Sequence, residues 1–378
     1  MMNIPSMPEG VEHTRDIQRS IQRNIQRKKT RPLWLRDVKI GDGAPISIQS
    51  MTKTDTRDQE ATLAQIERLA KAGCEIIRVA VPDQEAAEKI PYIVQHSPIP
   101  VIADIHFNHR LAIMALEGGV EGLRINPGNI GSREQVQEVV RLAQERGAVI
   151  RIGVNAGSME KDLYQKYGGA TPEAMVESAR RKVELLEVMG FSKIKISLKS
   201  SSVLDTIEAY RLIAKEMDYP LHLGITETGD AFCGGIKSAV GLGILLFEGI
   251  GDTVRVSLTA DPVLEVRAGY EILRALGIRA RGPEIISCPT CGRCEIDIQG
   301  LVRKVQERIS HLPHPLKVAI MGCVVNGPGE AKEADVGIAG GREVGVLFKN
   351  GKIIDKCREE DLFPALIALI EEITGAKL

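Results

Sequence analysis

The 378-residue sequence has few aromatic residues and almost no net charge. Phe, Trp and Tyr together make up 3% of the chain, and the formal net charge is −1 at pH 7. Proteins that bind nucleic acids usually present a basic surface to the phosphates and aromatic rings on which bases stack. Because the sequence offers neither, we expect no nucleic-acid partner.

Long apolar segments are also missing. The chain has no run of eighteen or more apolar residues, and its start lacks the apolar core of a signal peptide. We therefore expect a cytoplasmic protein without a membrane partner. Seven cysteines, three of them within seven positions, favour a metal site over a disulfide framework. Cys74, Cys233 and Cys357 stand alone and are expected to be ordinary core or surface residues.

From residue 46 onward, short β-rich runs alternate with amphipathic helical stretches. The eight strand candidates are 46–49, 76–81, 101–105, 122–125, 149–154, 193–198, 221–225 and 253–257. Eight β-α units over roughly 240 residues predict an α/β fold with a closed (β/α)8 TIM barrel. A doubly wound open sheet is the alternative, but it more often brings a Gly-x-Gly-x-x-Gly turn after the first strand, which is absent here.

The pattern changes after residue 282. The predicted elements are strands at 285–287, 318–321, 336–339, 344–348 and 352–354, with helices at 298–309 and 361–374. They indicate a small α+β domain. We therefore expect a basic N-terminal extension (1–32), a substrate-binding barrel (33–282) and an α+β domain (283–378). An isoleucine at every fourth position within 13–32 predicts a short basic helix, with a flexible arm as the alternative.

The α+β domain carries two cysteine segments. Cys288, Cys291 and Cys294 follow a Cys-x-x-Cys-x-x-Cys pattern, and Cys323 precedes an Asn-Gly-Pro-Gly-Glu sequence that ends at Glu330. Thiolates at this spacing can bind one soft metal centre, with a further ligand from the second segment. A structural zinc site is one interpretation. An iron–sulfur cluster is favoured, because zinc ribbons usually repeat Cys-x-x-Cys twice.

Polar side chains lie at the ends of nearly all the predicted strands, where a TIM barrel forms its active site. They are Arg78, Asp104, His106, Arg124, Asn126, Arg151, Asn155, Ser197, Lys199, Glu227, Arg255 and Ser257. The five cations among them outnumber the two carboxylates. A buried excess of positive charge must be neutralised by a ligand, and guanidinium groups suit phosphate oxygens. We therefore expect a strongly anionic substrate, most simply a diphosphate.

With these residues in place, the sequence resembles the bacterial hydroxymethylbutenyl diphosphate synthase family, also called the IspG or GcpE family, of the methylerythritol phosphate route to isoprenoids. The resemblance runs from about residue 45 to the end. Its motifs are ADIHF (103–107), LRINPGNIG (123–131), RIGVNAGS (151–158), LHLGITE (221–227), LTADP (258–262), SCPTCGR (287–293) and GCVVNGPGE (322–330).

The resemblance implies the reductive ring opening and dehydration of 2-C-methyl-D-erythritol 2,4-cyclodiphosphate to 4-hydroxy-3-methylbut-2-enyl diphosphate. Two electrons would pass through a [4Fe-4S] cluster, with flavodoxin or ferredoxin as donor. The implied cluster ligands are Cys288, Cys291, Cys323 and Glu330, and Glu227 is the implied acid-base residue. The implied diphosphate-binding residues are Arg78, Arg124, Arg151, Asn155, Lys199, Arg255 and Ser257, and we expect Asp104, His106 and Asn126 in the same site.

Several alternatives stay open at this point. Cys294 departs from the family pattern and is an alternative fourth ligand to Glu330, and Asp230 also departs from that pattern. The segment 156–170 is either a lid over the site or a solvated insertion. Two other functions compete with the reductase. One is a barrel that transfers a group to a pterin or sugar phosphate beside a structural metal, and the other is an electron carrier or redox sensor.

The chain's path predicts a homodimer with an active site shared between chains. The helix expected at 262–276 runs antiparallel to the eighth strand and returns the chain to the face opposite the mouth. Only residues 277–283 then precede the α+β domain, and seven residues extend at most roughly 25 Å. We therefore expect each α+β domain to cap the barrel of the other chain, as the family resemblance also implies.

Overall fold

The computed structural model describes residues 25–291, 294, 296–323, 329, 331–341 and 344–378. The chain divides into two compact units, Met1–Arg279 and Ala280–Leu378. Each unit has its own apolar core.

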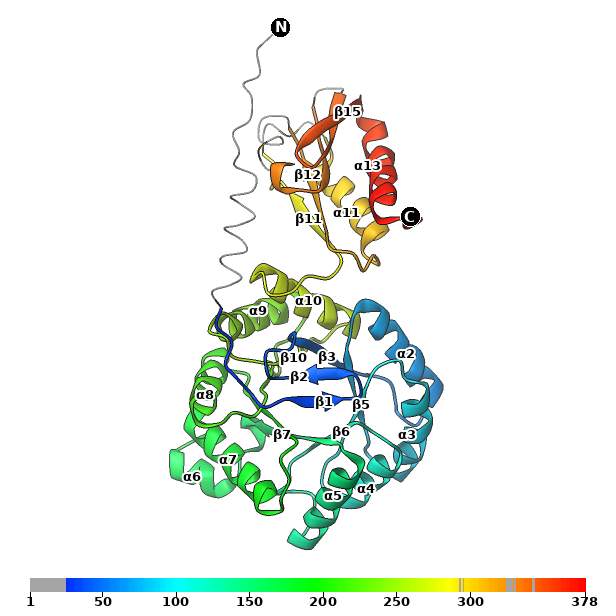
Figure 1. Cartoon of the computed structure of the whole chain (residues 1–378). Coiled ribbons are helices and arrows are strands. Elements are labelled where there is room, and N and C mark those ends of the chain that lie inside the picture. The colour runs from blue at the N-terminus through cyan, green and yellow to red at the C-terminus, as the bar shows by residue number, and fades with distance from the viewer. Residues whose placement is uncertain (1–24, 292–293, 295, 324–328, 330, 342–343) are drawn as a thin grey trace. The chain divides into compact units, whose positions relative to one another are not determined.

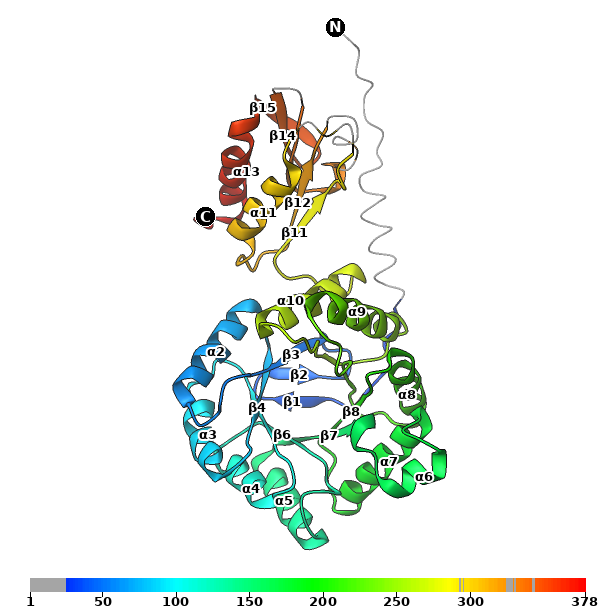
Figure 2. The same ribbon diagram turned by 180° about the vertical axis from the view of Figure 1, so that it is seen from behind.

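Eight parallel strands form the first unit's central barrel (Figures 1 and 2). They are β3 (Ser47–Met51), β4 (Ile76–Ala80), β5 (Val101–Asp104), β6 (Gly122–Ile125), β7 (Val149–Asn155), β8 (Ile194–Lys199), β9 (His222–Leu223) and β10 (Thr253–Val254). Their order is β8-β7-β6-β5-β4-β3-β10-β9, and a parallel bridge between Ile196 and Leu221 joins its two ends. The predicted closed barrel is confirmed, and the open sheet is wrong.

Helices surround these strands. They are α2 (Gln59–Ala72), α3 (Gln84–His96), α4 (His109–Glu117), α5 (Arg133–Arg146), α6 (Lys161–Tyr167), α7 (Pro172–Val188), α8 (Val203–Glu216), α9 (Ala231–Phe247) and α10 (Pro262–Ala275). At the start of α5, the side chains of Ser132 and Gln135 form a capping box. Within the described residues, no helix has the length and apolar content to cross a membrane.

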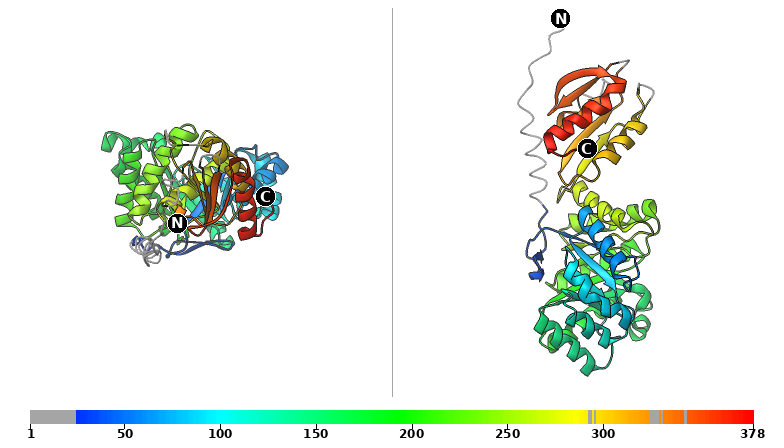
Figure 3. Two further views of the ribbon diagram at one scale, coloured as in Figure 1. Left: turned by 90° about the horizontal axis from the view of Figure 1, so that it is seen from above. Right: turned by 90° about the vertical axis from the view of Figure 1, so that its right-hand side faces the viewer.

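An antiparallel hairpin that the sequence reasoning missed closes one end of the barrel. It consists of β1 (Leu33–Leu35) and β2 (Val38–Ile40). Its leucine and isoleucine side chains pack against Ile76, Ile102 and Val149, which lie at the N-terminal ends of β4, β5 and β7. Figure 3 shows the hairpin at one end of the barrel. The hairpin therefore covers the N-terminal ends of the barrel strands with apolar side chains. The C-terminal ends, which carry the polar residues, lie at the opposite face.

The described part of the N-terminal extension, residues 25–32, contains no helix. Arg27 donates a hydrogen bond to Asp252 at 3.0 Å, and Lys28 donates to the carbonyl oxygens of Ala214 and Met217. These basic side chains therefore bind barrel carbonyls and a carboxylate instead of lining a helix. The remainder of the predicted helix, 13–24, lies outside the described residues.

The segment after β7 is folded but mostly exposed, so it fits a solvated insertion as well as a lid. It contains η1 (Ala156–Ser158) and α6, whose Leu163 is buried. Lys166 of α6 forms an ion pair with Glu177 of α7 at 2.6 Å. These contacts hold the segment against α7, and its closure over the site stays a prediction.

The second unit contains one mixed sheet, in the order β11-β12-β13-β14-β15. Its elements are β11 (Pro283–Ser287), α11 (Ile298–Ile309), β12 (Leu316–Met321), η2 (Ala331–Glu333), β13 (Val336–Ala339), β14 (Val344–Lys349), β15 (Lys352–Arg358) and α13 (Glu359–Thr374). Strands β11 to β13 are parallel, and β14 and β15 are antiparallel to their neighbours. The predicted α+β elements are confirmed. Helices α11 and α13 share an apolar core with the sheet (Figure 3).

Candidate active site and cluster loops

The mouth of the barrel brings most of the predicted cations together around one carboxylate. Asp104 at the end of β5 lies 3.6 Å from the Arg78 guanidinium and 3.3 Å from that of Arg124. Arg151 and Lys199 are buried on β7 and β8. We call Arg78, Arg124, Arg151, Lys199 and Arg255 the cationic ring. Its side chains point inward because they occupy the alternate positions of the strands that face the barrel interior.

The ring has more positive charge than Asp104 can balance. Burial, repulsion from Arg255 and repulsion from Arg124 lower the pKa of Arg78 to about 9, although Asp104 opposes them. Burial and then the neighbouring cations also hold the pKa values of Arg151 and Lys199 well below their usual range. These shifts indicate a site that is stabilised by an incoming anion.

The charge of Asp104 is stabilised in the same site. Burial by itself would raise the pKa of Asp104, but Arg78, Arg124 and Arg151 together hold it below its usual value. Nη1 of Arg124 also donates to Nε2 of His106 at 2.6 Å. Burial and Arg124 lower the pKa of His106, as expected for a ring nitrogen that accepts this hydrogen bond.

Two glycines create the space for ring side chains. A Cβ on Gly153 would lie 2.9 Å from Nε of Arg124. A Cβ on Gly224 would lie 2.6 Å from Nζ of Lys199 and 2.7 Å from the carbonyl oxygen of Arg255. All three distances are shorter than real Cβ contacts, so the inward cations need these glycines on β7 and immediately after β9.

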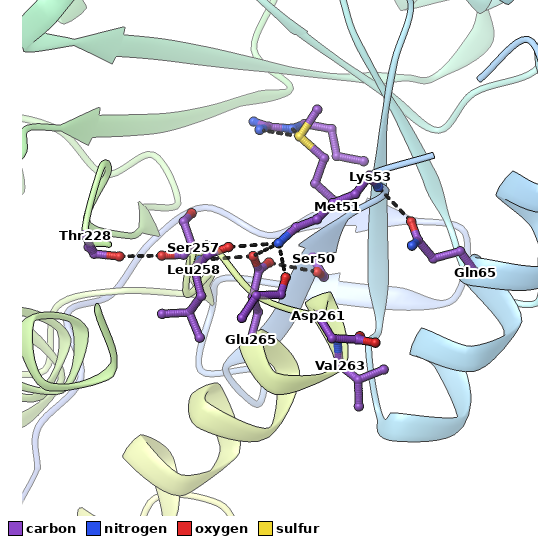
Figure 4. Close-up of polar contacts among 12 residues, drawn as sticks. Ser50, Met51, Lys53, Gln65, Thr228, Ser257, Leu258, Asp261, Val263 and Glu265 are labelled. Carbon is purple, nitrogen blue, oxygen red and sulfur yellow. Dashed lines mark hydrogen bonds and ion pairs between the residues drawn. The ribbon is translucent and has the colours of Figure 1, made fainter. Parts of the chain in front are cut away.

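A network that the sequence reasoning missed fixes the loop after β10 (Figure 4). Glu265 of α10 accepts hydrogen bonds from Ser50 at 3.2 Å and from the backbone N–H of Leu258 at 3.0 Å. Lys53 lies 3.2 Å from Glu265 and donates to the carbonyl oxygen of Leu258 at 2.8 Å. Because Ser257 precedes Leu258, this network holds a predicted site residue in place.

Glu227 is exposed in the loop after β9, and among the described residues it forms no ion pair with the cationic ring. Its backbone is left-handed, with φ 54°. This conformation is uncommon for a residue other than glycine and is enriched at functional sites. The adjacent Thr228 is buried and donates a hydrogen bond to the carbonyl oxygen of Ser257, which joins the loops after β9 and β10.

The other predicted mouth residues lie at the same end of the barrel. Asn155 ends β7, while Asn126 and Ser257 follow β6 and β10, and all three are half-buried. Asn126 accepts a hydrogen bond from the backbone N–H of Gly128 at 3.3 Å. The sequence reasoning did not select Lys195, which is also buried inside the barrel. Its alternation with Ser197 and Lys199 was the signal that places it on the same inward face.

The two cysteine segments meet in the second unit because β11 and β12 are adjacent parallel strands. Cys288 follows β11, and Gly322 follows β12 directly before Cys323. The backbone N–H of Gly322 donates to Sγ of Cys288 at 3.3 Å. A Cβ on Gly322 would lie 2.6 Å from Sγ of Cys294, so the first cysteine loop lies against the second.

The four clustered cysteines do not have the same surroundings. Sγ of Cys294 donates to the carbonyl oxygen of Ile296 at 3.2 Å, whereas Sγ of Cys288 accepts from a backbone N–H. Thr290, between Cys288 and Cys291, has a left-handed backbone with φ 60°. For a β-branched residue this is a clear outlier, which marks the loop as a constrained site.

All seven cysteines lie in the described part of the chain, and none forms a disulfide. Glu330 lies outside the described residues. Among the residues that are described, no group of three or more His, Cys, Asp or Glu side chains is arranged to hold a metal ion. The soft donors nevertheless fit an iron–sulfur group, because clusters are held by thiolates whose sulfurs accept backbone hydrogen bonds.

Comparisons with known proteins agree with both parts of this description. The model of the GcpE TIM-barrel domain matches residues 30–270, and that of the GcpE protein C-terminal domain matches residues 284–372. Similar proteins named 4-hydroxy-3-methylbut-2-en-1-yl diphosphate synthase (flavodoxin) occur in Geobacter sulfurreducens, Maridesulfovibrio salexigens and Thermodesulfovibrio yellowstonii. Their identities are 60%, 59% and 57%, over 93%, 91% and 92% of this chain and 99%, 97% and 99% of the relatives. The chain therefore belongs to the GcpE family.

Proposed function

We propose that this protein converts 2-C-methyl-D-erythritol 2,4-cyclodiphosphate into 4-hydroxy-3-methylbut-2-enyl diphosphate, a reaction of isoprenoid precursor biosynthesis. The observation that carries this proposal is the cationic ring around Asp104, which has the charge and the guanidinium geometry for a diphosphate. The names of the relatives supply the identity of the product.

The cationic ring of the protein has a role in the reaction beyond substrate binding. When the ring of the cyclodiphosphate opens, the bond between carbon and one phosphate oxygen breaks and that oxygen keeps the electron pair. The diphosphate thereby gains negative charge, which the cationic ring stabilises more strongly than the charge of the substrate. Arg78, Arg124 and Arg151 are already buried in place, so little reorganisation is needed when this charge develops.

The reaction also needs two electrons and one proton, and it releases a hydroxyl group of the substrate as water. A [4Fe-4S] cluster would supply the electrons one at a time, because no protein side chain is a ready reductant. We propose Cys288, Cys291, Cys323 and Glu330 as its ligands. Glu227 is proposed to give the proton to the departing hydroxyl, since a carboxyl group at the mouth can act as a general acid.

One observation supports Glu330 over Cys294 as the fourth ligand. The thiol of Cys294 is directed at the carbonyl oxygen of Ile296. A thiolate ligand would instead need hydrogen-bond donors around its sulfur, as Cys288 has. A carboxylate oxygen is also more readily exchanged on iron than a thiolate is, which leaves one iron accessible to the substrate.

The reductase is tested by purifying the protein without oxygen and supplying the cyclodiphosphate with a chemical reductant. We expect iron and acid-labile sulfide in the protein, a visible absorption band that reduction bleaches, and formation of the linear diphosphate. Zinc without iron would contradict the proposal and support a structural metal beside a group-transfer barrel. Iron without turnover would support an electron carrier or redox sensor.

We propose flavodoxin as the electron donor, as the names of the relatives state for those proteins. Ferredoxin delivers electrons singly as well and is the alternative. Cys233, which is not a proposed cluster ligand, is exposed and forms no disulfide. Such thiols persist in a reducing compartment, which supports function in the cytoplasm.

The path of α10 supports an active site shared between two chains. Glu265 near the start of α10 contacts the loop at the mouth. After the end of α10, Arg279 donates to the carbonyl oxygen of Ile46 at 3.0 Å and to Glu75 at 2.8 Å, directly before β3 and β4. The first unit therefore ends at the face opposite the mouth, and only residues 280–282 precede β11. Three residues extend roughly 10 Å, so we propose that each cluster serves the barrel of a second copy.

Helix α9 supplies an apolar surface for such a homodimer. Phe232, Ile236 and Val240 recur every fourth residue and are exposed, with Phe232 at 75% and Val240 at 50%. Lys237 is the helix's one charged residue. An exposed apolar stripe of this kind usually marks an interaction site, and two copies of one stripe can pack about a two-fold axis.

Mixing two inactive variants tests the shared site. Glu227→Ala loses the proposed acid and Cys323→Ala loses a proposed cluster ligand, so each homodimer should be inactive. A heterodimer would hold one intact barrel opposite one intact cluster. Random exchange of equal amounts should restore about a quarter of the wild-type turnover, because half of the dimers are mixed and each has one intact site of two. Turnover after mixing is the measurement.

The α9 surface provides the control for this experiment. Val240→Glu in both chains places like charges on the proposed interface and should reduce both dimer content and the restored turnover. Ser192→Glu, on a short connection away from α9, should leave the dimer intact. Exchange that is demonstrated by mass spectrometry but restores no turnover would show that each cluster serves its own barrel.

A further inference from the structure

A second tier of polar side chains lies inside the barrel below the cationic ring. Lys195 on β8 and His222 on β9 are fully buried, with 0% exposure, and Gln49 on β3 is buried with them. Nζ of Lys195, both ring nitrogens of His222 and both amide atoms of Gln49 have no hydrogen-bond partner among the described residues. Buried polar atoms without partners are rare and costly, so this tier calls for an explanation.

Lys195 is the amine of this tier, and the charges around it are mostly positive. Arg151 is its register partner on β7, and Arg78 and His222 are the other titratable groups near it on the barrel strands. The nearby carboxylate is Asp252 at the start of β10. Asp252 already accepts hydrogen bonds from Arg27 at 3.0 Å and from the backbone N–H of Leu221 at 2.9 Å. Lys195 therefore faces several cations and shares the carboxylate of Asp252 with Arg27.

This environment places the titration of Lys195 in the physiological range. Burial, followed by repulsion from Arg151, lowers the pKa of Lys195 to about 7. Burial and the same cations hold the pKa of His222 well below its usual value, so His222 stays neutral at this pH. In the free protein above pH 7, Lys195 is therefore largely uncharged.

An anion at the mouth raises the pKa of Lys195 again, because a negative charge favours the protonated form of a nearby amine. We infer that Lys195 takes up a proton when the anionic substrate enters the mouth of the barrel, so that substrate binding is linked to protonation of a residue beneath the cationic ring. The inference rests on the proposed function for the identity of the ligand. It makes Lys195 a positioning residue that adjusts the charge of the site to the charge of its occupant.

The direction of the pH effect follows from linkage. Substrate raises the pKa of Lys195, so the affinity that this proton contributes is fully present below the pKa of the free protein, near 7. It is lost as the pH rises toward the pKa of the complex. Between these two values the dissociation constant should increase by up to about tenfold per pH unit.

Titration calorimetry with the cyclodiphosphate and the holoenzyme tests the inference. Each phosphorus of this ligand carries one strongly acidic hydroxyl, so the ligand itself does not titrate near neutral pH. The measured heat is compared in buffers with different ionisation enthalpies at pH 8, which counts the protons that accompany binding. We expect wild-type protein to take up a substantial fraction of one proton per site, and its dissociation constant should increase from pH 7 to pH 8.5.

Three variants assign the proton. Lys195→Met keeps a similar length without a titrating amine and should bind more weakly with no proton uptake. Lys195→Arg keeps a permanent charge and should bind without uptake and with little pH dependence. His222→Gln removes the neighbouring imidazole and should keep the proton uptake. Thermal unfolding of each variant checks that the barrel is intact.

Each result decides the question. Wild-type binding without proton uptake would overturn the inference even if no variant folds, and so would unchanged uptake in Lys195→Met or its loss in His222→Gln. Failure of wild-type protein to bind the cyclodiphosphate at any pH would overturn the proposed function, and this inference with it.

Discussion

Replacing Glu227 with glutamine is expected to reduce turnover by about 10²–10⁴-fold, the usual contribution of general acid catalysis, with a much smaller effect on KM. Glutamine has nearly the same size but cannot donate a carboxylic proton to the departing hydroxyl. Glu227 is exposed at the mouth and forms no ion pair with the cationic ring among the described residues, so its loss should leave diphosphate binding almost unchanged. Steady-state kinetics with a chemical reductant give kcat and KM separately.

The left-handed backbone of Glu227 makes glutamine the appropriate replacement. Its φ of 54° is tolerated by the native side chain, and glutamine has similar backbone preferences, so the loop should keep its shape. Glu173→Gln is the matched control, because Glu173 is exposed in the first turn of α7, at the same end of the barrel. Near-normal kcat in Glu227→Gln would assign the proton to another donor.

Replacing Cys323 with alanine is expected to remove the cluster and abolish turnover. Clusters of this type are held by few ligands, and the chain around Cys323 contributes one of the two segments that meet at Gly322. Iron and sulfide analysis, the visible spectrum and turnover should all decrease together. Substrate binding to the barrel should persist, since the cationic ring belongs to the other unit.

The remaining cysteines and Glu330 identify the fourth ligand. Cys294→Ala should retain iron, because the Cys294 thiol already donates to the carbonyl oxygen of Ile296. Cys357→Ala, at a half-buried position on β15, is the matched control and should also retain iron. Glu330→Ala should lose or destabilise the cluster. Retained iron in Glu330→Ala together with lost iron in Cys294→Ala would reverse the assignment.

The pattern of polar residues along the strands predicted most of the cationic ring. Arg78, Arg124 and Arg151 were predicted to converge at the C-terminal ends of the barrel strands. Arg151 lies nearer the start of β7, but its charge still lowers the pKa of Asp104 together with those of Arg78 and Arg124. The same alternation places Lys195 inward with Lys199. Lys195 was not predicted as a site residue, because charged residues ordinarily lie at the surface and a lysine buried without a partner is unusual.

Contacts between distant residues were out of reach of the sequence reasoning. Glu265 holds Ser50 although the two are 215 positions apart, and nothing in either local sequence indicates the pairing. The β1-β2 hairpin was missed for a related reason. It belongs to no β-α unit, and its leucines are explained only by the apolar strand residues that they cover at the base of the barrel.

The sequence by itself determined the architecture, the cysteine segments and the anionic character of the ligand. Each is written in local order: eight repeats of strand and helix, cysteine spacing, and cations at strand ends. Only the tertiary structure decided which cations share Asp104, that Cys294 is directed at a backbone carbonyl, and that Lys195 shares Asp252 with Arg27. Closure of the barrel and the pairing of β11 with β12 bring these groups together, and the burial that results sets their charges.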